Sequence, residues 1–388
     1  MFLMNVPTRA LFGYGTLEKL HEEVLPGKKA LIVISGGKAT KANGYLARVE
    51  KELDKAGVVH CLFDEIEANP LDTTVMRGAA AARANDCDFI LALGGGSVMD
   101  ASKAIAAMAA NEGELWDYIQ SGTGGRKALA VHPLPLVCVT TTAGTGSETD
   151  CGAVISNLKT KEKPGFVDPA LFPVLAIIDP ELMLSVPPIF TAFQGFDALF
   201  HSTECCISNK ANLMSDIFAF TAVENVAKNL AACVKEGGNR EAREKVAFAN
   251  YLSGFSMMTG SCTSEHSLEH ALSAFHHELP HGAGLIMLAR AYYTHFIKKG
   301  CCPERFIKMA RIMGMAEADK PEDFVTMLDK LMKACGVAEL KMSDYGITRA
   351  EFPEMARNAR ETMGFLFSCD PAVLTDKDSI SIYEASYK

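Results

Sequence analysis

The first half of the chain alternates short, β-branched apolar runs with segments whose apolar residues recur at helical spacing. This alternation is typical of parallel βα units. It predicts strands at residues 29–34, 58–63, 89–93, 135–140 and 174–178, and helices at residues 45–56 and 100–110. We therefore expect the N-terminal part to be an α/β domain with a Rossmann-like parallel sheet.

The second half has a different pattern. From about Pro187 onward Ala, Met, Leu, Glu and Lys dominate and β-branched runs become scarce, which predicts helices. The pair Pro187-Pro188 marks the change, because proline disfavours the continuation of regular structure before it. We expect an α/β domain over residues 1–186 and an all-α domain over residues 187–388.

Composition narrows the classes of protein to consider. The 388 residues are 48% hydrophobic and 22% charged, as in an ordinary globular protein. A net charge of -9 without a long basic stripe argues against nucleic acid as a partner. The N-terminus lacks a secretory signal, and the uncharged stretch 128–147 is interrupted by prolines, so we expect a cytoplasmic protein with no membrane segment.

The chain has twelve cysteines but no C-x-x-C pair. In a chain of this length without a secretory signal, such cysteines are expected to be reduced thiols. The sequence therefore gives no support to a structural zinc knuckle or a thioredoxin-type redox pair.

Two glycine-containing loops follow predicted strands. Gly94-Gly95-Gly96-Ser97 lies between a strand and a helix, where close backbone approach and free N-H groups suit a pyrophosphate. The loop 140–148 (TTTAGTGSE) follows the strand 135–140 and offers hydroxyls to a ribose or a phosphate. Each could be an ordinary turn, but two such loops after successive strands predict a nucleotide across the strand ends.

Histidines concentrate in the second half, where six of the ten lie between His201 and His281. Asp197 and His201 are four residues apart, as are His266 and His270, so each pair lies on one face of a helix. Asp197 has mostly apolar neighbours, among which an unpaired charge is costly. One carboxylate and three imidazoles would bind a divalent transition metal and leave a position for a substrate oxygen.

Other interpretations of these residues stay open. Cys205 follows His201 by four positions and Cys262 precedes His266 by four, which also fits a Cys/His zinc site. We favour the Asp/His set on residue type. The pair His276-His277 is expected at the substrate pocket or at the surface, and Phe255 and Met258 are further candidates for the pocket.

Taken in order, these segments resemble the iron-containing (group III) alcohol dehydrogenase family. The resemblance is carried by VPTRALFGYG, GGGSVMDASKAIA, TTAGTGSE, IIDPELMLSVPP, GFDALFHSTE and HxxxHALSAFHHELPHGAGLIM. They span residues 6 to about 288 in the family's order, which is more specific than any one of them. The resemblance implies an α/β nucleotide-binding domain and a helical domain with the active site between them.

The resemblance also implies roles for individual residues. The family's metal ligands correspond to Asp197, His201, His266 and His281, and His270 would lie near the nicotinamide and the substrate. The chain has one residue more than the family's usual spacing between His270 and His281, so His270 remains an alternative to His266 as a ligand. Ferrous iron is the expected metal, with Zn²⁺ as the alternative.

The loop after the first predicted strand bears on the choice of nucleotide. Residues 35–41 (SGGKATK) contain no acid and resemble the Gly/Lys loop of NADP-dependent members, so we expect NADP(H), with NAD(H) as the alternative. The residues expected to bind the cofactor are Gly36, Gly37, Lys38, Thr40, Lys41, Gly94, Gly95, Gly96, Ser97, Asp100, Thr141, Thr142, Thr145, Ser147 and Lys163.

The expected function is reversible hydride transfer between NAD(P)(H) and a primary alcohol or aldehyde, in a homo-oligomer for which a dimer is the first choice. His270 is the expected catalytic residue, acting in a proton relay or in substrate positioning. The nearest alternative is a glycerol dehydrogenase or another dehydroquinate-synthase-like enzyme. A non-catalytic nucleotide- and metal-binding protein and a zinc hydrolase are the alternatives of other classes.

Overall fold

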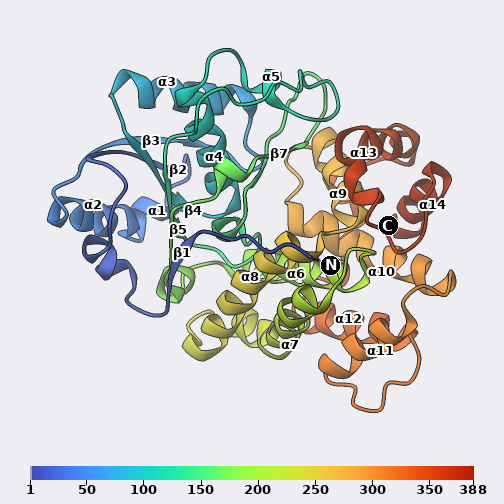
Figure 1. Cartoon of the computed structure of the whole chain (residues 1–388). Helices are drawn as coiled ribbons and strands as arrows, with labels where there is room; N and C mark the ends of the chain where they lie inside the picture. The colour runs from blue at the N-terminus through green and yellow to red at the C-terminus, as the bar shows by residue number, and fades with distance from the viewer. Residues whose placement is uncertain (1) are drawn as a thin grey trace.

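The computed structural model describes residues 2–388. Its N-terminal half, blue to green in Figure 1, is a sheet with helices on both faces, and its C-terminal half, yellow to red, consists of helices packed on one another. The predicted combination of a Rossmann-like parallel sheet and an all-α C-terminal part is confirmed.

The strands are β1 (Arg9–Phe12), β2 (Lys29–Ser35), β3 (Val59–Ile66), β4 (Phe89–Gly94), β5 (Leu136–Thr140), β6 (Gly152–Val154), β7 (Gly165–Val167) and β8 (Leu175–Ile178). Six of them form one sheet in the order β1-β8-β5-β4-β2-β3, and all neighbouring pairs are parallel. Strands β6 and β7 pair with each other in an antiparallel ribbon. Because β3 and β4 lie on opposite sides of β2, the order reverses beside β2, where open α/β sheets bind ligands at their carboxyl ends.

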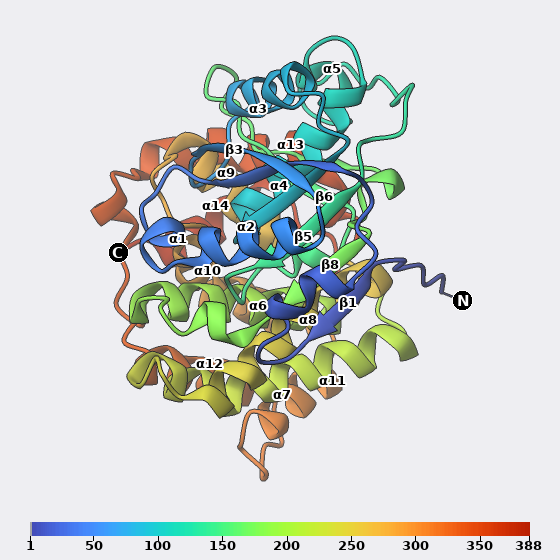
Figure 2. The same ribbon diagram turned by 90° about the vertical axis from the view of Figure 1, so that its left-hand side faces the viewer.

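The helices of the N-terminal half are α1 (Ala39–Ala42), α2 (Tyr45–Lys55), α3 (Asp72–Ala84), α4 (Gly96–Ala110) and α5 (Leu115–Tyr118). Those of the C-terminal half are α6 (Pro188–Ile207), α7 (Leu213–Lys235), α8 (Arg240–Gly260), α9 (Ser264–Phe275), α10 (His281–Lys298), α11 (Pro303–Ile312), α12 (Glu322–Ala334), α13 (Phe352–Phe367) and α14 (Asp376–Ser386). Figure 2 shows α2 in front of the sheet, with the helical half behind and below it.

The central strands are apolar on both faces because helices cover both. On β2, Ile32 packs with Val49 of α2 in one buried cluster, while Leu31 and Val33 pack with Ile105 of α4 in the cluster on the other face. Continuous apolar runs are what parallel strands buried on both sides require. This explains why hydrophobic runs located the inner strands from the sequence.

The predicted strands correspond to β2, β3, β4, β5 and β8, and the predicted helices to α2 and α4. Helix α4 begins at Gly96, four residues before the predicted start, because the glycine turn itself forms its first turn. Strand β1, helix α3 and the ribbon β6-β7 were not predicted. Strands of three or four residues, such as β1, β6 and β7, are too short to show a periodic pattern.

The helical half surrounds a core that includes residues of α6, α7, α9, α10 and α13. Helix α6 begins at Pro188, which fits the preference for proline in a first helical turn. Among residues 2–388, α7 is long and apolar enough to cross a membrane by length and composition alone. Its Val223, Val226 and Leu230 are buried against the other helices, as expected of a core helix.

Candidate active site in the cleft between the sheet and the helical half

The glycine turn between β4 and α4 forms part of the floor of a cleft. Gly94, Gly95 and Gly96 all have ordinary negative or extended backbone angles, so the turn does not depend on positive φ. A Cβ on Gly95 would lie 2.7 Å from Cγ2 of Thr142, and one on Gly96 would lie 2.3 Å from Cγ2 of Thr145. Glycine is therefore required at positions 95 and 96, because the loop of residues 140–148, called the threonine loop below, packs directly on the turn.

The threonine loop after β5 also contacts the helical half. The backbone N-H of Gly146 donates to Oδ1 of Asn250 on α8 at 2.8 Å, and Nδ2 of Asn250 donates to Glu148 at 2.7 Å. The carbonyl of Gly144 faces Nδ1 of His201 on α6 at 3.2 Å. One loop thus borders the predicted nucleotide site and positions a predicted metal ligand.

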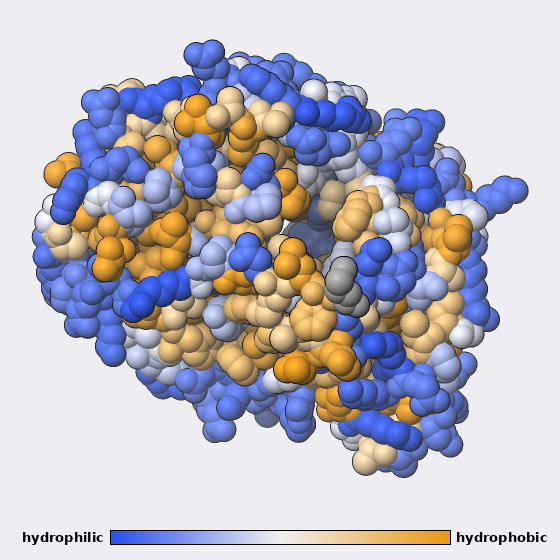
Figure 3. Space-filling view, viewed as in Figure 1, coloured by the Kyte–Doolittle hydropathy of each residue, from blue (hydrophilic) through white to orange (hydrophobic). Residues whose placement is uncertain are grey.

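A cleft of about 650 Å³ opens at the carboxyl ends of β2, β4 and β5. Figure 3 shows a hollow near the middle of the molecular face between the two halves. Of the predicted cofactor residues, the cleft is lined by Thr40, Gly94, Gly95, Gly96, Ser97, Thr141, Thr142 and Thr145. Its size and its backbone N-H groups at the start of α4 suit a dinucleotide.

Four predicted cofactor residues line neither this cleft nor the inner cavity described below: Gly36, Gly37, Lys38 and Lys41. The ammonium group of Lys41 pairs with the carboxylate of Asp64 on β3, the strand beside β2. Residues 35–41 contain no acid themselves, but in the folded protein this loop therefore has an acidic neighbour. Asp64 lies beside the loop because β3 pairs with β2, and the sequence of the loop alone does not reveal this neighbour.

A second, inner cavity of about 290 Å³ adjoins the cleft, and Ser97, Thr145 and His281 line both. Its lining includes the apolar side chains of Met257, Met258, Met363 and Leu366. The lining also includes the predicted cofactor residues Asp100, Ser147 and Lys163, together with His201, His266 and His270. The cavity thus has space for a small organic molecule beside the cleft.

Behind Asp100 lies a buried polar network. Asp100 accepts hydrogen bonds from Oγ of Ser147 at 2.7 Å and from the N-H of Val154 at 2.8 Å. The fully buried Lys103 donates to Ser147, to Asp150 and to the carbonyl of Gly152. Burial raises the pKa of Asp100 to about 6, although Lys103 opposes the shift. The network fixes Asp100 at the cavity wall; Lys103 and Asp150 were not among the predicted residues.

The predicted metal ligands converge on one carboxylate oxygen. Oδ1 of Asp197 lies 3.6 Å from Nε2 of His201 and 3.5 Å from Nε2 of both His266 and His281. The rings of His201 and His266 stack with centroids 4.3 Å apart. Three helices therefore bring together four side chains that are distant in the sequence.

Each of these imidazoles is oriented through its other nitrogen. Nδ1 of His266 lies 2.5 Å from a carboxylate oxygen of Glu204, and Nδ1 of His281 contacts Glu269. His201 has the carbonyl of Gly144 in the same role. A hydrogen bond at Nδ1 places the proton there and leaves the lone pair of Nε2 toward Asp197, which is the usual arrangement of metal-binding histidines.

The four converging groups all have shifted pKa values. Burial would lower the pKa values of His266 and His281, but the carboxylates that contact these imidazoles outweigh burial and raise both. Burial would raise the pKa of Asp197, but the surrounding imidazoles outweigh it and hold this pKa well below its ordinary value. Burial lowers the pKa of His201 to about 3 despite the opposing effect of Asp197. Oδ1 of Asp197 and Nε2 of His266 are buried without any hydrogen-bond partner. A carboxylate oxygen and an imidazole nitrogen that are both buried, unpaired and 3.5 Å apart fit a cation between them.

His270 lies apart from Asp197. Its ring centroid is 5.3 Å from that of His281 and 6.4 Å from that of His266, and it borders the inner cavity. Burial and the nearby Lys163 keep the pKa of His270 well below its ordinary value, and its Nδ1 has no partner. In this geometry His266 faces Asp197, and His270 faces the cavity.

Lys163, in the segment before β7, contacts the helical half. Its ammonium group donates to Asn69 at 2.9 Å and to Ser273 of α9 at 2.8 Å, and it lies 3.6 Å from Glu269. Lys163 therefore supports the carboxylate that orients His281 as well as bordering the inner cavity. Asn69, Glu204 and Glu269 are residues of this site that the sequence analysis did not single out.

The remaining candidates separate into two groups. Met258 lines the inner cavity and His277 lines the cleft. His276 instead faces Glu351 at 3.1 Å, and Phe255 packs against Phe218 and Tyr251, so neither lines either cavity. The sequence around His276 and Phe255 could not separate pocket positions from core or surface positions, because apolar and loop-like segments occur at all three.

Comparison with known proteins identifies the family. Residues 7–180 match the model of iron-containing alcohol dehydrogenases, and residues 191–387 match the C-terminal model of the Fe-containing alcohol dehydrogenase family. The chain therefore belongs to the iron-containing alcohol dehydrogenase family, as its motifs indicated.

Individual relatives agree with this assignment. The chain is 34% identical to the 1,3-propanediol dehydrogenase of Klebsiella pneumoniae over 92% of both chains. It is 31% identical to the probable NADH-dependent butanol dehydrogenase 1 of Bacillus subtilis over 98% of both. A solved archaeal halo-thermophilic alcohol dehydrogenase from a Red Sea brine pool matches with a TM-score of 0.94 and 32% identity, covering 100% of this chain and 99% of that one. The protein is thus an oxidoreductase that acts on alcohols, in a family that uses NAD(H) and a metal ion.

Proposed function

We propose that this protein is a metal-dependent alcohol dehydrogenase and aldehyde reductase that transfers a hydride between NAD(P)(H) and a primary alcohol or aldehyde. In oxidation the alcohol carbon gives a hydride to NAD(P)⁺ and the hydroxyl gives a proton to water; reduction is the reverse. The observation that carries the proposal is the convergence of three imidazole nitrogens on Asp197 beside a cavity that adjoins the dinucleotide cleft.

Asp197, His201, His266 and His281 would hold the metal. The unpaired Oδ1 of Asp197 and Nε2 of His266 fit this role, since an ion would satisfy both. A divalent cation supplies a Lewis acid that polarises the substrate oxygen. Fe²⁺ is the proposed ion and Zn²⁺ the alternative, because a set of one carboxylate and three imidazoles suits either.

The nucleotide would lie in the cleft with its phosphates against the glycine turn and the threonine loop. Asp100, Ser147 and Lys163 would border the nicotinamide end. Gly36, Gly37, Lys38 and Lys41 would lie near the adenosine ribose, and the two lysines support NADP(H) as the preferred nucleotide. Asp64 supports the alternative, NAD(H), because an acid at this position binds ribose hydroxyls and repels a 2′-phosphate.

His270 would act at the substrate. It borders the inner cavity, its Nδ1 is unpaired, and it does not face Asp197. A neutral imidazole in this position accepts a proton from the alcohol side and returns it in the reverse reaction. We further propose the division into a nucleotide-binding domain of residues 1–186 and a metal-binding domain of residues 187–388, a homodimer, and a cytoplasmic location.

The test is a steady-state assay at the absorbance of the reduced nicotinamide. The protein is loaded with Fe²⁺ or Zn²⁺ and supplied with short aliphatic aldehydes and with NADPH or NADH. The proposal expects metal-dependent turnover and a higher kcat/KM with NADPH. A higher kcat/KM with NADH that moves toward NADPH in Asp64→Asn would replace the NADP(H) proposal with one in which Asp64 selects NAD(H). Absence of turnover with every metal and nucleotide would overturn the proposed activity.

A further inference from the structure

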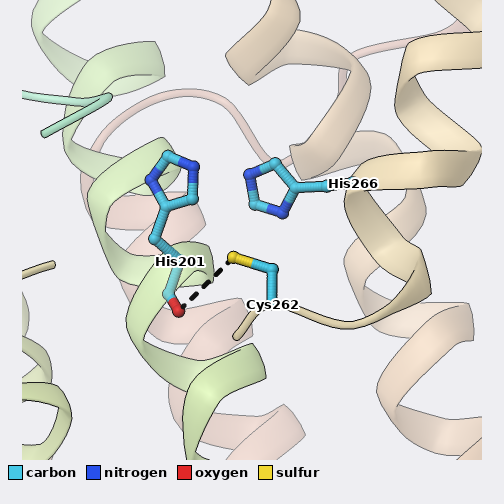
Figure 4. Close-up of side chains that lie close together, drawn as sticks. All are labelled: His201, Cys262 and His266. Carbon is cyan, nitrogen blue, oxygen red and sulfur yellow. Dashed lines mark hydrogen bonds between the residues drawn. The ribbon is translucent and has the colours of Figure 1, made fainter. Parts of the chain in front are cut away.

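A thiol lies beside two of the imidazoles that face Asp197. Cys262 precedes α9, and its side chain points toward the rings of His201 and His266 (Figure 4). Ligand atoms of these three residues all lie within 4.8 Å of one another, and all three residues are buried. The Sγ atom contacts the carbonyl of His201 at 4.0 Å. These positions bring a sulfur atom beside two of the three imidazoles that face Asp197.

Two further observations point to a ligand. Nε2 of His266 is buried and unpaired, so a lone pair is available. Cys262 also lines the inner cavity, together with His201 and His266, so an incoming ion can reach all three. Each imidazole has only one free lone pair at Nε2. A cation bound by His201, Cys262 and His266 is therefore the same cation that Asp197 and His281 would bind, in a different coordination.

The chemistry of sulfur decides which cations use Cys262. Thiolates favour soft or borderline cations such as Zn²⁺ and Cd²⁺, whereas carboxylate oxygens suit harder ions. Two imidazoles and one thiolate are a known type of zinc ligand set. When the Sγ-metal bond forms, the S-H bond breaks and its proton passes to water, with no change of oxidation state.

We propose that Cys262 is an additional, thiolate ligand that this centre offers to Zn²⁺ and Cd²⁺ but does not use for Fe²⁺. The proposal rests on the proposed metal centre, since His201 and His266 are shared. A soft cation bound in this way gains a ligand on the cavity side and loses the position that a substrate oxygen would take. Zn²⁺ and Cd²⁺ should therefore bind more tightly than Fe²⁺ and inhibit the iron-loaded enzyme. Turnover of the zinc-loaded protein, with Zn²⁺ as the catalytic ion, would contradict this part of the proposal.

The direct test is absorption spectroscopy of the full-length protein, dialysed against a chelator and then titrated with Cd²⁺. A cadmium-thiolate bond produces a charge-transfer band in the ultraviolet that carboxylate and imidazole ligands do not produce. The wild type should show this band at one equivalent of Cd²⁺, and Cys262→Ser should lack it. Competition with a chelator should show that Cys262→Ser weakens the binding of Zn²⁺ and Cd²⁺ about tenfold or more while leaving that of Fe²⁺ unchanged.

The matched control is Cys205→Ala. Cys205 is a buried thiol on α6, four residues after His201. It neighbours Cys262 and raises the pKa of the Cys262 thiol, but it is not grouped with the two imidazoles. This variant should keep the band and the affinity for Cd²⁺. If the band were lost in Cys205→Ala and kept in Cys262→Ser, the thiolate ligand would be Cys205. That result would overturn the proposal.

The titrations also distinguish failure of the role of Cys262 from failure of the proposed Asp/His centre. Stoichiometric binding of Cd²⁺ without a thiolate band would overturn the role of Cys262 and leave the Asp/His centre standing. No binding of Cd²⁺ or Fe²⁺ would remove the proposed centre itself, and with it this inference. An equal loss of affinity for Fe²⁺ and Zn²⁺ in Cys262→Ser would contradict the selectivity for soft cations.

Discussion

Oε2 of Glu204 lies 2.5 Å from Nδ1 of His266, so a carboxylate of the helix that contains Asp197 orients an imidazole of another helix. The second oxygen of Glu204 accepts the backbone N-H of His266 at 3.2 Å. One buried carboxylate therefore fixes both the position and the tautomer of His266. Such partners typically raise the affinity of a metal site by 10–100-fold.

Glu204→Gln is expected to lower the affinity for Fe²⁺ or Co²⁺ by about 10–100-fold, because the neutral amide no longer favours the Nδ1-protonated tautomer. The measurement is competition with a chromophoric chelator. Glu265→Gln is the matched control, since Glu265 is a buried carboxylate in the same helix as His266 whose oxygens have no hydrogen-bond partner. Equal effects of the two substitutions would show that Glu204 has no special part in metal binding.

His266→Ala and His270→Ala should have different consequences. The first removes a nitrogen that faces Asp197 at 3.5 Å, so the purified variant should contain little metal. The second should retain the metal but lose kcat by about a hundredfold or more, as expected for removal of a group that transfers protons. Metal analysis and a pH profile of kcat distinguish the two. Loss of metal from His270→Ala with retention in His266→Ala would exchange their roles.

Met363→Ala should change the preference for substrate chain length. Met363 lies at a break in α13, with φ -132° and ψ 35°, and its side chain lines the inner cavity. Its Sδ accepts a hydrogen bond from the N-H of Gly165 at 3.2 Å, which joins α13 to β7. Shortening this side chain lengthens the cavity.

The ratio of kcat/KM for a long-chain alcohol to that for a short-chain alcohol is therefore expected to rise about tenfold in Met363→Ala. Met363→Leu, which roughly conserves volume, should keep the ratio of the wild type. If both variants had the same ratio as the wild type, Met363 would not limit the cavity.

Asp370→Asn should flatten the dependence of stability on pH. Burial raises the pKa of Asp370 to about 7, although hydrogen bonds from Ser264 oppose the shift, and its Oδ2 has no partner. Between its ordinary value of 3.8 and about 7, the unfolded chain is ionised at this residue and the folded chain is protonated. The folded state binds more protons in this range, so stability falls as pH rises through it.

An asparagine can still accept the hydrogen bonds at Oδ1 but cannot ionise. The stability of the wild type relative to Asp370→Asn should therefore decrease from about pH 4 to about pH 7, by an amount on the order of a few kcal/mol at most. Tm measured across this range checks the expectation. Parallel curves for the two proteins would mean that Asp370 does not titrate between these values.

The sequence was sufficient for features that depend on local pattern. Runs such as FILAL at 89–93 identify buried strands because parallel strands need apolar residues on both faces. The spacing of Asp197 and His201 within one helix reveals two of the converging side chains. Glu204 follows His201 by three positions on that helix; this spacing could have indicated a polar residue near the site, but the sequence analysis did not single Glu204 out.

Other features depend on how distant segments meet. Glu204 bonds His266 of another helix, and Asp64 reaches Lys41 only because β3 pairs with β2. The sequence analysis interprets Gly94-Gly95-Gly96 as a phosphate-binding turn or an ordinary turn. In the structure, side chains of the threonine loop exclude larger residues at Gly95 and Gly96, and Val98 does so at Gly94. Such contacts between segments leave no periodic signal in either segment alone.

The carbonyl of Gly144 makes the proposed metal centre depend on both halves of the chain. A fragment that began at residue 187 would contain Asp197, His201 and the other converging imidazoles, yet it would lack the acceptor that orients His201. It would also lack Lys163, which supports Glu269 from the N-terminal half. The geometry of the proposed centre is therefore complete only when the sheet and the helical half are packed together.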